Sequence, residues 1–226
     1  MFTKAILLAL AASPLVAAHG KVAVITGNAG GNTTALGIQG GIVPGPGKNS
    51  VTEVDTTVFK STKAATDGLG KTTGGGKNTL AKMTAVMAQS GSTLPQVSTS
   101  GGSISGTIHI VTTDGAGPYT AIVDPTGTGA FSTGTTATVT TQVPGNKGNI
   151  AAPKQRGLVT RTLVNLGIVK RASNVNEDHA FAASIPAGTT CTGTVGGQTG
   201  VCLVKIVNPS NAGPFGGVIA IQMTGA

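Results

Sequence analysis

The fold is decided by Ser103-Ile104-Ser105-Gly106-Thr107-Ile108-His109-Ile110-Val111, where apolar and polar residues alternate. Ile104, Ile108 and Ile110 share one face and His109 lies on the other, a period of two that is typical of a strand with one buried face. Other short segments are similarly rich in Val, Ile, Thr and Ala, and we expect strands at 21–25, 119–123, 180–185, 202–207 and 218–223. The sequence therefore predicts an all-β protein.

The composition favours short strands joined by long loops. The chain of 226 residues contains 36 Gly, five Phe, one Tyr and no Trp, and 10% of its residues are charged. Few aromatic and charged residues, together with abundant Val, Ile and Thr, favour strands over helices. Residues 79–88 are the best helical candidate, because their apolar side chains recur with a helical period. We expect an immunoglobulin- or fibronectin-like β-sandwich with long glycine-rich loops and one or two short helices.

Residues 1–18 have the pattern of a secretory signal peptide. Lys4 precedes an apolar run at 5–12, and Val16 and Ala18 stand at positions −3 and −1 of a cleavage site. The run is too short to span a bilayer, which needs about 20 residues. We therefore expect a protein that is secreted to the extracellular space or cell wall without membrane insertion. Residues 19–226 are expected to form one domain.

The two cysteines and one asparagine fit an exported protein. Cys191 and Cys202 flank a glycine-rich turn and are expected to form one disulfide in an oxidising compartment. Asn32-Thr33-Thr34 is an N-glycosylation sequon. Lys170-Arg171 is a dibasic pair that is either a processing site or a solvated corner of the chain.

A cut after Ala18 would make His19 the first residue of the mature protein. An N-terminal histidine offers its α-amine and an imidazole nitrogen as neutral donors at mild pH, and Cu(II) favours such donors. The candidates for a further ligand are His109, Asp114 in a tight turn, and His179 just before the strand expected at 180–185. Ordinary roles stay open for each: Asp114 could cap its turn, and the histidines could be surface or hydrogen-bonded residues.

The formal net charge of +8 falls to +7 when Lys4 leaves with the signal peptide. This charge favours anionic cell-wall or host-surface polymers as partners, or it simply keeps a weakly charged monomer soluble. Nucleic acid is not expected as a partner, because the charges are scattered and no stacking aromatic residues interleave with them.

Several blocks of sequence resemble a family of fungal secreted virulence factors of appressoria, the Egh-sixteen-like proteins. The blocks lie in order along the chain: His19-Gly20, 30–37, 55–59, 70–76, Leu94-Pro95-Gln96-Val97, 106–119, 185–193, 201–205, 212–217 and Ile221-Gln222-Met223. The resemblance implies a secreted, effector-like protein that aids host-surface or cell-wall penetration. Typical members have more cysteines, and this chain carries extra sequence around 146–174.

A second, weaker resemblance is to lytic polysaccharide monooxygenases, which hold copper in a histidine brace. It implies that His19 supplies two ligands, that Asp114 stands near the place of the second histidine, and that Phe215 is the axial aromatic residue. The competing function is therefore a copper-dependent oxidative enzyme. Against it, carbohydrate-binding faces need exposed aromatic rings, and Tyr119 is the only Tyr of this chain. The chain has no H-E-x-x-H motif of a zinc protease.

Overall fold

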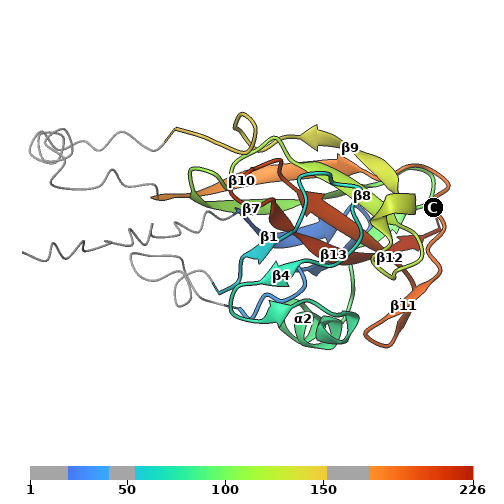
Figure 1. Cartoon of the computed structure of the whole chain (residues 1–226). Helices are drawn as coiled ribbons and strands as arrows, with labels where there is room; N and C mark the ends of the chain where they lie inside the picture. The colour runs from blue at the N-terminus through green and yellow to red at the C-terminus, as the bar shows by residue number, and fades with distance from the viewer. Residues whose placement is uncertain (1–19, 41–53, 152–173, 226) are drawn as a thin grey trace, which may run out of the picture.

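Seven β-strands hydrogen-bond to their neighbours in a closed ring and so form a β-barrel (Figure 1). The computed structural model describes residues 20–40, 54–151 and 174–225. Around the barrel, the strands are β1 (Gly20–Gly27), β7 (Ser103–Thr112), β10 (Asn174–Ser184), β9 (Thr135–Thr141), β8 (Thr120–Asp124), β12 (Gln198–Val207) and β13 (Phe215–Thr224). β13 runs parallel to β1, and every other neighbouring pair in the ring is antiparallel.

The predicted all-β class is confirmed, but the expected two-sheet sandwich is wrong, because the described strands form one closed barrel. β1 pairs with both β7 and β13, and β12 pairs with both β8 and β13. A sandwich and a barrel both bury one face of each strand, so the alternation of apolar residues does not distinguish them. The difference lies in which strands are partners, and a period of two carries no information about partners.

Shorter strands extend the sheet beyond the seven-stranded ring. β2 (Gly30–Thr33) pairs with β1, β6 (Gln96–Ser98) with β13, and β11 (Gly193–Val195) with β12. β3 (Thr57–Val58), β4 (Lys71–Thr72) and β5 (Gly76–Lys77) continue the ladder from the start of β13. The 3-10 turn η1 (Leu80–Lys82) leads into α2 (Met83–Ser90), which confirms the helix expected at 79–88, and η2 (Phe131–Thr133) precedes β9. None of the helices in the described ranges is long and apolar enough to cross a membrane.

Apolar side chains from every strand of the ring fill the barrel interior. Ile104, Ile108 and Ile110 are fully buried there, so the alternation predicted at 103–111 is confirmed. β10 begins at Asn174, earlier than the strand expected at 180–185, so His179 lies within the strand and not before it.

A second apolar cluster covers the outer face of β12 and β13. Val204 and Ile206 face the barrel interior, whereas Val201 and Leu203 face outward and join a cluster that includes Met83 of α2. β12 is therefore buried on both faces, which explains why residues 201–207 are almost continuously apolar. Figure 1 shows α2 lying along this side of the barrel.

Lys205 is the exception in this apolar strand, because it is only 1% exposed. Its ammonium donates a hydrogen bond to the carbonyl oxygen of Thr66 at 2.9 Å and lies 4.4 Å from the ring centroid of Phe59 and 5.6 Å from that of Phe131. Burial lowers the pKa of Lys205 to about 8, although the negative charge of Asp67 opposes the shift. A carbonyl dipole and two ring faces thus replace the water that normally surrounds an ammonium group.

Asp124, at the end of β8, is fully buried and organises the loop that follows it. Its carboxylate accepts hydrogen bonds from the backbone N–H groups of Thr126, Thr128, Gly129 and Ala130 and from the Thr126 hydroxyl. Burial opposes ionisation of this group, but these hydrogen bonds outweigh it and lower the pKa of Asp124 below its usual value. The carboxylate therefore acts as a polar core for residues 125–130.

The disulfide expected between Cys191 and Cys202 is present, and it ties the segment before β11 to the buried face of β12. We expect Cys191→Ser/Cys202→Ser to lower the free energy of unfolding by about 3 kcal/mol, because the bond closes a short loop in the unfolded chain. Urea unfolding measures the change, with the reduced wild-type protein as the matched control. Equal stability of the oxidised wild type and the variant would contradict the prediction.

We also expect Lys205→Met to change how stability depends on pH. The pKa of Lys205 is about 8 in the folded protein, against an ordinary value of 10.5 for a lysine in the unfolded chain, so between these values the unfolded chain binds more protons than the folded chain. The free energy of unfolding of the wild type should therefore rise with pH in this window, and Met removes that part of the rise. Urea unfolding at about pH 7.5 and about pH 9.5 measures it. The exposed Lys147→Met is the control and should keep the rise; a rise that persists in Lys205→Met would contradict the prediction.

Candidate functional site

The start of β1 packs against the turn between β7 and β8. Gly20 lies opposite Ile110 of β7. A Cβ atom at Gly20 would overlap the hydroxyl of Tyr119 and the carbonyl oxygen of Gly115. Only glycine fits without displacement, so the first described residue is held tightly at this end of the barrel.

Side chains from three segments fix the turn itself. The Thr112 hydroxyl donates to the Asp114 carboxylate at 2.9 Å, and the Tyr119 hydroxyl donates to the carbonyl oxygen of Gly115 at 2.7 Å. The Asn208 amide donates to the carbonyl oxygens of Asp114 at 3.2 Å and Ala116 at 2.9 Å. The turn is therefore a rigid structure, as a binding site requires.

Asn208 also fixes Phe215, the residue expected to act as an axial aromatic group. Its side-chain oxygen accepts the backbone N–H of Phe215 at 2.8 Å, and its own backbone N–H donates to the Phe215 carbonyl at 2.9 Å. Phe215 is buried at the start of β13. The sequence analysis missed Asn208, because an Asn-Pro pair between two strands signals only a turn.

His109 lies on the outer face of β7, in a row with Lys21 of β1 and Asp178 of β10. Its Nδ1 lies 2.7 Å from an oxygen of Asp178, while its buried Nε2 has no hydrogen-bond partner among the described residues. In the neutral tautomer that donates Nδ1–H to Asp178, the free Nε2 lone pair can bind a metal. The neighbouring Lys21 ammonium is paired with Asp55 at 3.3 Å.

His179 and Asp114 have different surroundings. His179 lies opposite Ile108, whose side chain fills the barrel, so His179 and His109 project from opposite faces of the wall. The Nε2 of His179 lies 3.4 Å from the carboxylate of Glu177. Burial raises the pKa of the Asp114 carboxyl, partly opposed by the hydrogen bond from Thr112, and this disfavours the ionised form that binds metals.

The structure thus brings His109 together with Asp178 and separates it from His179. Within residues 20–40, 54–151 and 174–225, no three His, Cys, Asp or Glu side chains are grouped so as to hold a metal ion. His19, the expected signal peptide at 1–18 and Lys170-Arg171 lie outside the described residues. The sequon residue Asn32 is exposed on β2.

Comparison with known proteins finds one family. The Egh16-like virulence factor family matches residues 17–216. The appressoria-specific virulence factor GAS1 of Pyricularia oryzae strain 70-15 is 39% identical over 216 residues, which cover 95% of this chain and 76% of that protein. GAS2 of the same fungus is 29% identical over 283 residues, covering 100% of this chain and 90% of that protein. No solved structure matches the chain significantly. The family resemblance drawn from the sequence is confirmed, and the likeness to lytic polysaccharide monooxygenases stays a prediction.

The packing of Gly20 can be tested by a double-mutant cycle. We expect Gly20→Ala to lower the free energy of unfolding by about 1–3 kcal/mol, because its methyl group overlaps Tyr119 and Gly115. Tyr119→Phe removes the overlapping hydroxyl, so the two substitutions together should cost less than the sum of their separate costs. Urea unfolding of the four proteins measures the coupling, and additive costs would contradict this packing.

Proposed function

The chain belongs to the Egh16-like virulence factor family, and on this premise we propose that it is a secreted, effector-like fungal protein that aids penetration of a host surface or cell wall and binds one copper ion through the mature N-terminal His19. The family match over residues 17–216 is the observation that carries the virulence role. Secretion is supported by the signal-like residues 1–18 and by the disulfide between Cys191 and Cys202, a bond typical of exported proteins.

Copper binding is supported by the residues around the start of β1. His19 directly precedes Gly20, which is held against the rigid turn at 112–119. His19 would contribute two nitrogen donors from the terminus, and His109 is the side chain best suited to add a third. Copper bound there would supply either a stable Cu(II) site or a redox-active one.

His109 is preferred to the other two candidates for chemical reasons. Asp178 accepts a hydrogen bond from Nδ1–H, which orients the ring and makes Nε2 a better donor. His179 lies on the opposite face of the strand wall, beside Glu177. Asp114 has a raised pKa and a carboxylate oxygen already bonded by Thr112.

A non-catalytic role is favoured over an oxidative enzyme by the surface. The chain has no Trp, and its one Tyr, Tyr119, is buried. The phenylalanines among the described residues are buried as well, namely Phe59, Phe131, Phe181 and Phe215. Within the described residues, therefore, no aromatic ring offers a stacking platform for polysaccharide.

Calorimetric titration with Cu(II) tests the copper proposal on the exported protein. His19→Ala, or one residue added ahead of His19, should abolish tight binding, because each removes or displaces the terminal chelate. Asp178→Ala should weaken binding by about 10- to 100-fold, since it removes the partner that orients His109. His179→Ala is the matched control and should leave the affinity unchanged.

Two outcomes would decide against the proposal. Unchanged affinity in the His19 variants would show that the terminus does not hold the metal. Oxidised sugars released from chitin, glucan or pectin in the presence of peroxide would favour the enzyme instead. Tight one-to-one binding without such products supports the effector-like role.

A further inference from the structure

A small cavity lies away from the start of β1, between α2, residues 37–39 and the β4–β5 turn. Its volume is about 230 Å³, and its lining residues are Gly37, Ile38, Gln39, Gly75, Lys82, Ala85 and Gln89. This is below the size typical of sites for drug-sized ligands, and it suits a single sugar residue.

Two hydrogen-bond donors converge at the turn side of this cavity. A Cβ atom built on Gly75 would lie 3.3 Å from the Lys82 ammonium and 3.4 Å from the Gln39 amide nitrogen, so both donors approach the same small space. The Lys82 ammonium donates to the Gly75 carbonyl at 2.6 Å. Gln89 donates to the Ile38 carbonyl at 3.2 Å, which leaves its own oxygen as an acceptor. An ammonium, an amide N–H and an amide oxygen together match a carboxylate that carries hydroxyl groups beside it.

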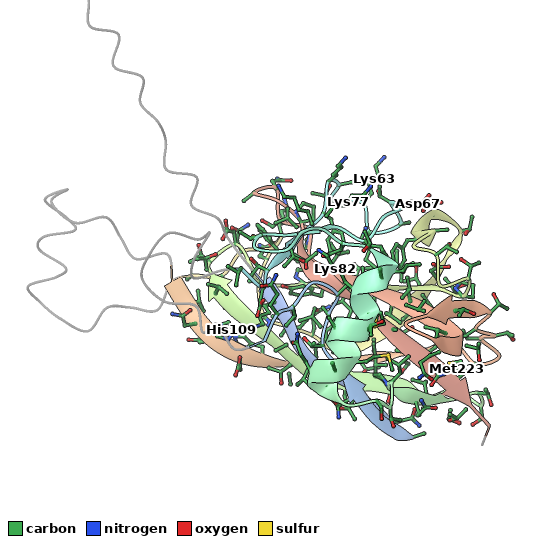
Figure 2. All side chains as sticks on the ribbon, turned by 90° about the horizontal axis from the view of Figure 1, so that it is seen from below. Lys63, Asp67, Lys77, Lys82, His109 and Met223 are labelled. Carbon is green, nitrogen blue, oxygen red and sulfur yellow. A yellow bond between two sulfur atoms is a disulfide. The ribbon has the colours of Figure 1, made fainter. Side chains whose placement is uncertain are left out.

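Two exposed lysines flank the β4–β5 turn, whose Gly75 lines the cavity. Lys71 and Lys77 are exposed and lie directly opposite each other in the β4–β5 pair, an arrangement of like charges that is unfavourable unless an anion lies between them. Lys63 is also exposed, and Figure 2 shows it with Lys77 at one edge of the molecule. Asp67 is the only acidic residue between positions 60 and 82, and its carboxylate accepts the Ser132 N–H at 2.7 Å.

We propose that this cavity and its lysines bind an acidic polysaccharide. One uronic acid residue would occupy the cavity, with its carboxylate on Lys82 and Gln39, and neighbouring carboxylates of the same extended chain would contact Lys71 and Lys77. This inference rests on the proposed role at a host surface or cell wall and names the polymer that the protein meets there. It does not depend on copper.

The surroundings favour a polysaccharide over other polyanions. Among the described residues, Val24 on β1 is the one large apolar side chain that is exposed, so the patch offers nothing to insert into a membrane. The described aromatic rings are buried, so no stacking platform for single-stranded nucleic acid lies beside the lysines. Binding would be mainly electrostatic and therefore sensitive to salt.

Binding of the exported protein to polygalacturonate, measured at low and moderate salt, tests the proposal. The fully methyl-esterified polymer is the control ligand and should bind at least tenfold more weakly, because its carboxylates carry no charge. Lys71→Gln/Lys77→Gln should reduce affinity roughly 25-fold, at about fivefold for each lysine removed from contact with a polyanion. The exposed Lys147→Gln should change it less than twofold.

Gly75→Ala distinguishes binding of the polymer in the cavity from nonspecific electrostatic attraction to the lysines. It keeps every charge and needs no positive φ, yet it adds a methyl group between the Lys82 and Gln39 donors. We expect about a tenfold loss of affinity for polygalacturonate, with an unchanged melting temperature. An unchanged affinity in Gly75→Ala, or equal binding to esterified polymer, would overturn the proposal. Tighter binding to anionic phospholipid vesicles or to single-stranded DNA than to polygalacturonate would also overturn it. Copper titrations decide the proposed function separately, because His19 variants should bind the polymer normally.

Discussion

Closure of the barrel depends on how closely β13 can approach its two neighbours. Gly216 lies opposite Lys21 of β1 and Val207 of β12, and Gly217 lies opposite Ile206. A Cβ atom at Gly216 would overlap the Ile206 carbonyl of β12, and one at Gly217 would fall 2.5 Å from the Cβ of Ala35 and 3.3 Å from the Cβ of Val22 in β1. The Gly-Gly pair therefore lets the last strand join the first and closes the ring, so that no edge of these strands stays open for another chain.

Closure also fixes what lies at this end of the molecule. Because β13 enters beside β1, the start of β1, Phe215 and the turn after β7 all meet, and Asn208 links two of them by side-chain hydrogen bonds. The backbone at Gly20 is thus held by the turn after β7, although it lies at the very start of β1, where a strand end would otherwise be free to move. The physical basis of the proposed copper site is this support, since a metal site needs donors held within a fraction of an ångström.

Much of the secondary structure could be predicted from the sequence, and the missing parts have physical causes. The strand at 103–111, the helix near 79–88 and the disulfide follow from period, composition and compartment, which are local properties. The barrel, the earlier start of β10 and the face on which His179 lies depend on strand pairing, which is not local. The structural roles of Asp124 and Asn208 were not predicted. In a sequence, a short polar residue near a turn gives the same signal whether its side chain is exposed or is buried with several hydrogen-bond partners. The resemblance to known families supplied the virulence role, and no motif in the residues alone would have done so.

The two proposed sites follow from the uneven distribution of charge. The exposed carboxylate of Asp178 lies on β10 beside His109, whereas the exposed Lys71 and Lys77 lie opposite each other in the β4–β5 hairpin. Figure 2 shows His109 well away from the edge that carries Lys63 and Lys77. The proposed metal ion would be attracted to the first region and the proposed polyanion to the second, because a surface charge acts over about 8–10 Å at physiological ionic strength. If both proposals hold, a protein held on an acidic polymer through its lysines would leave the His109 region free, and the polymer and the metal would not compete for the same residues.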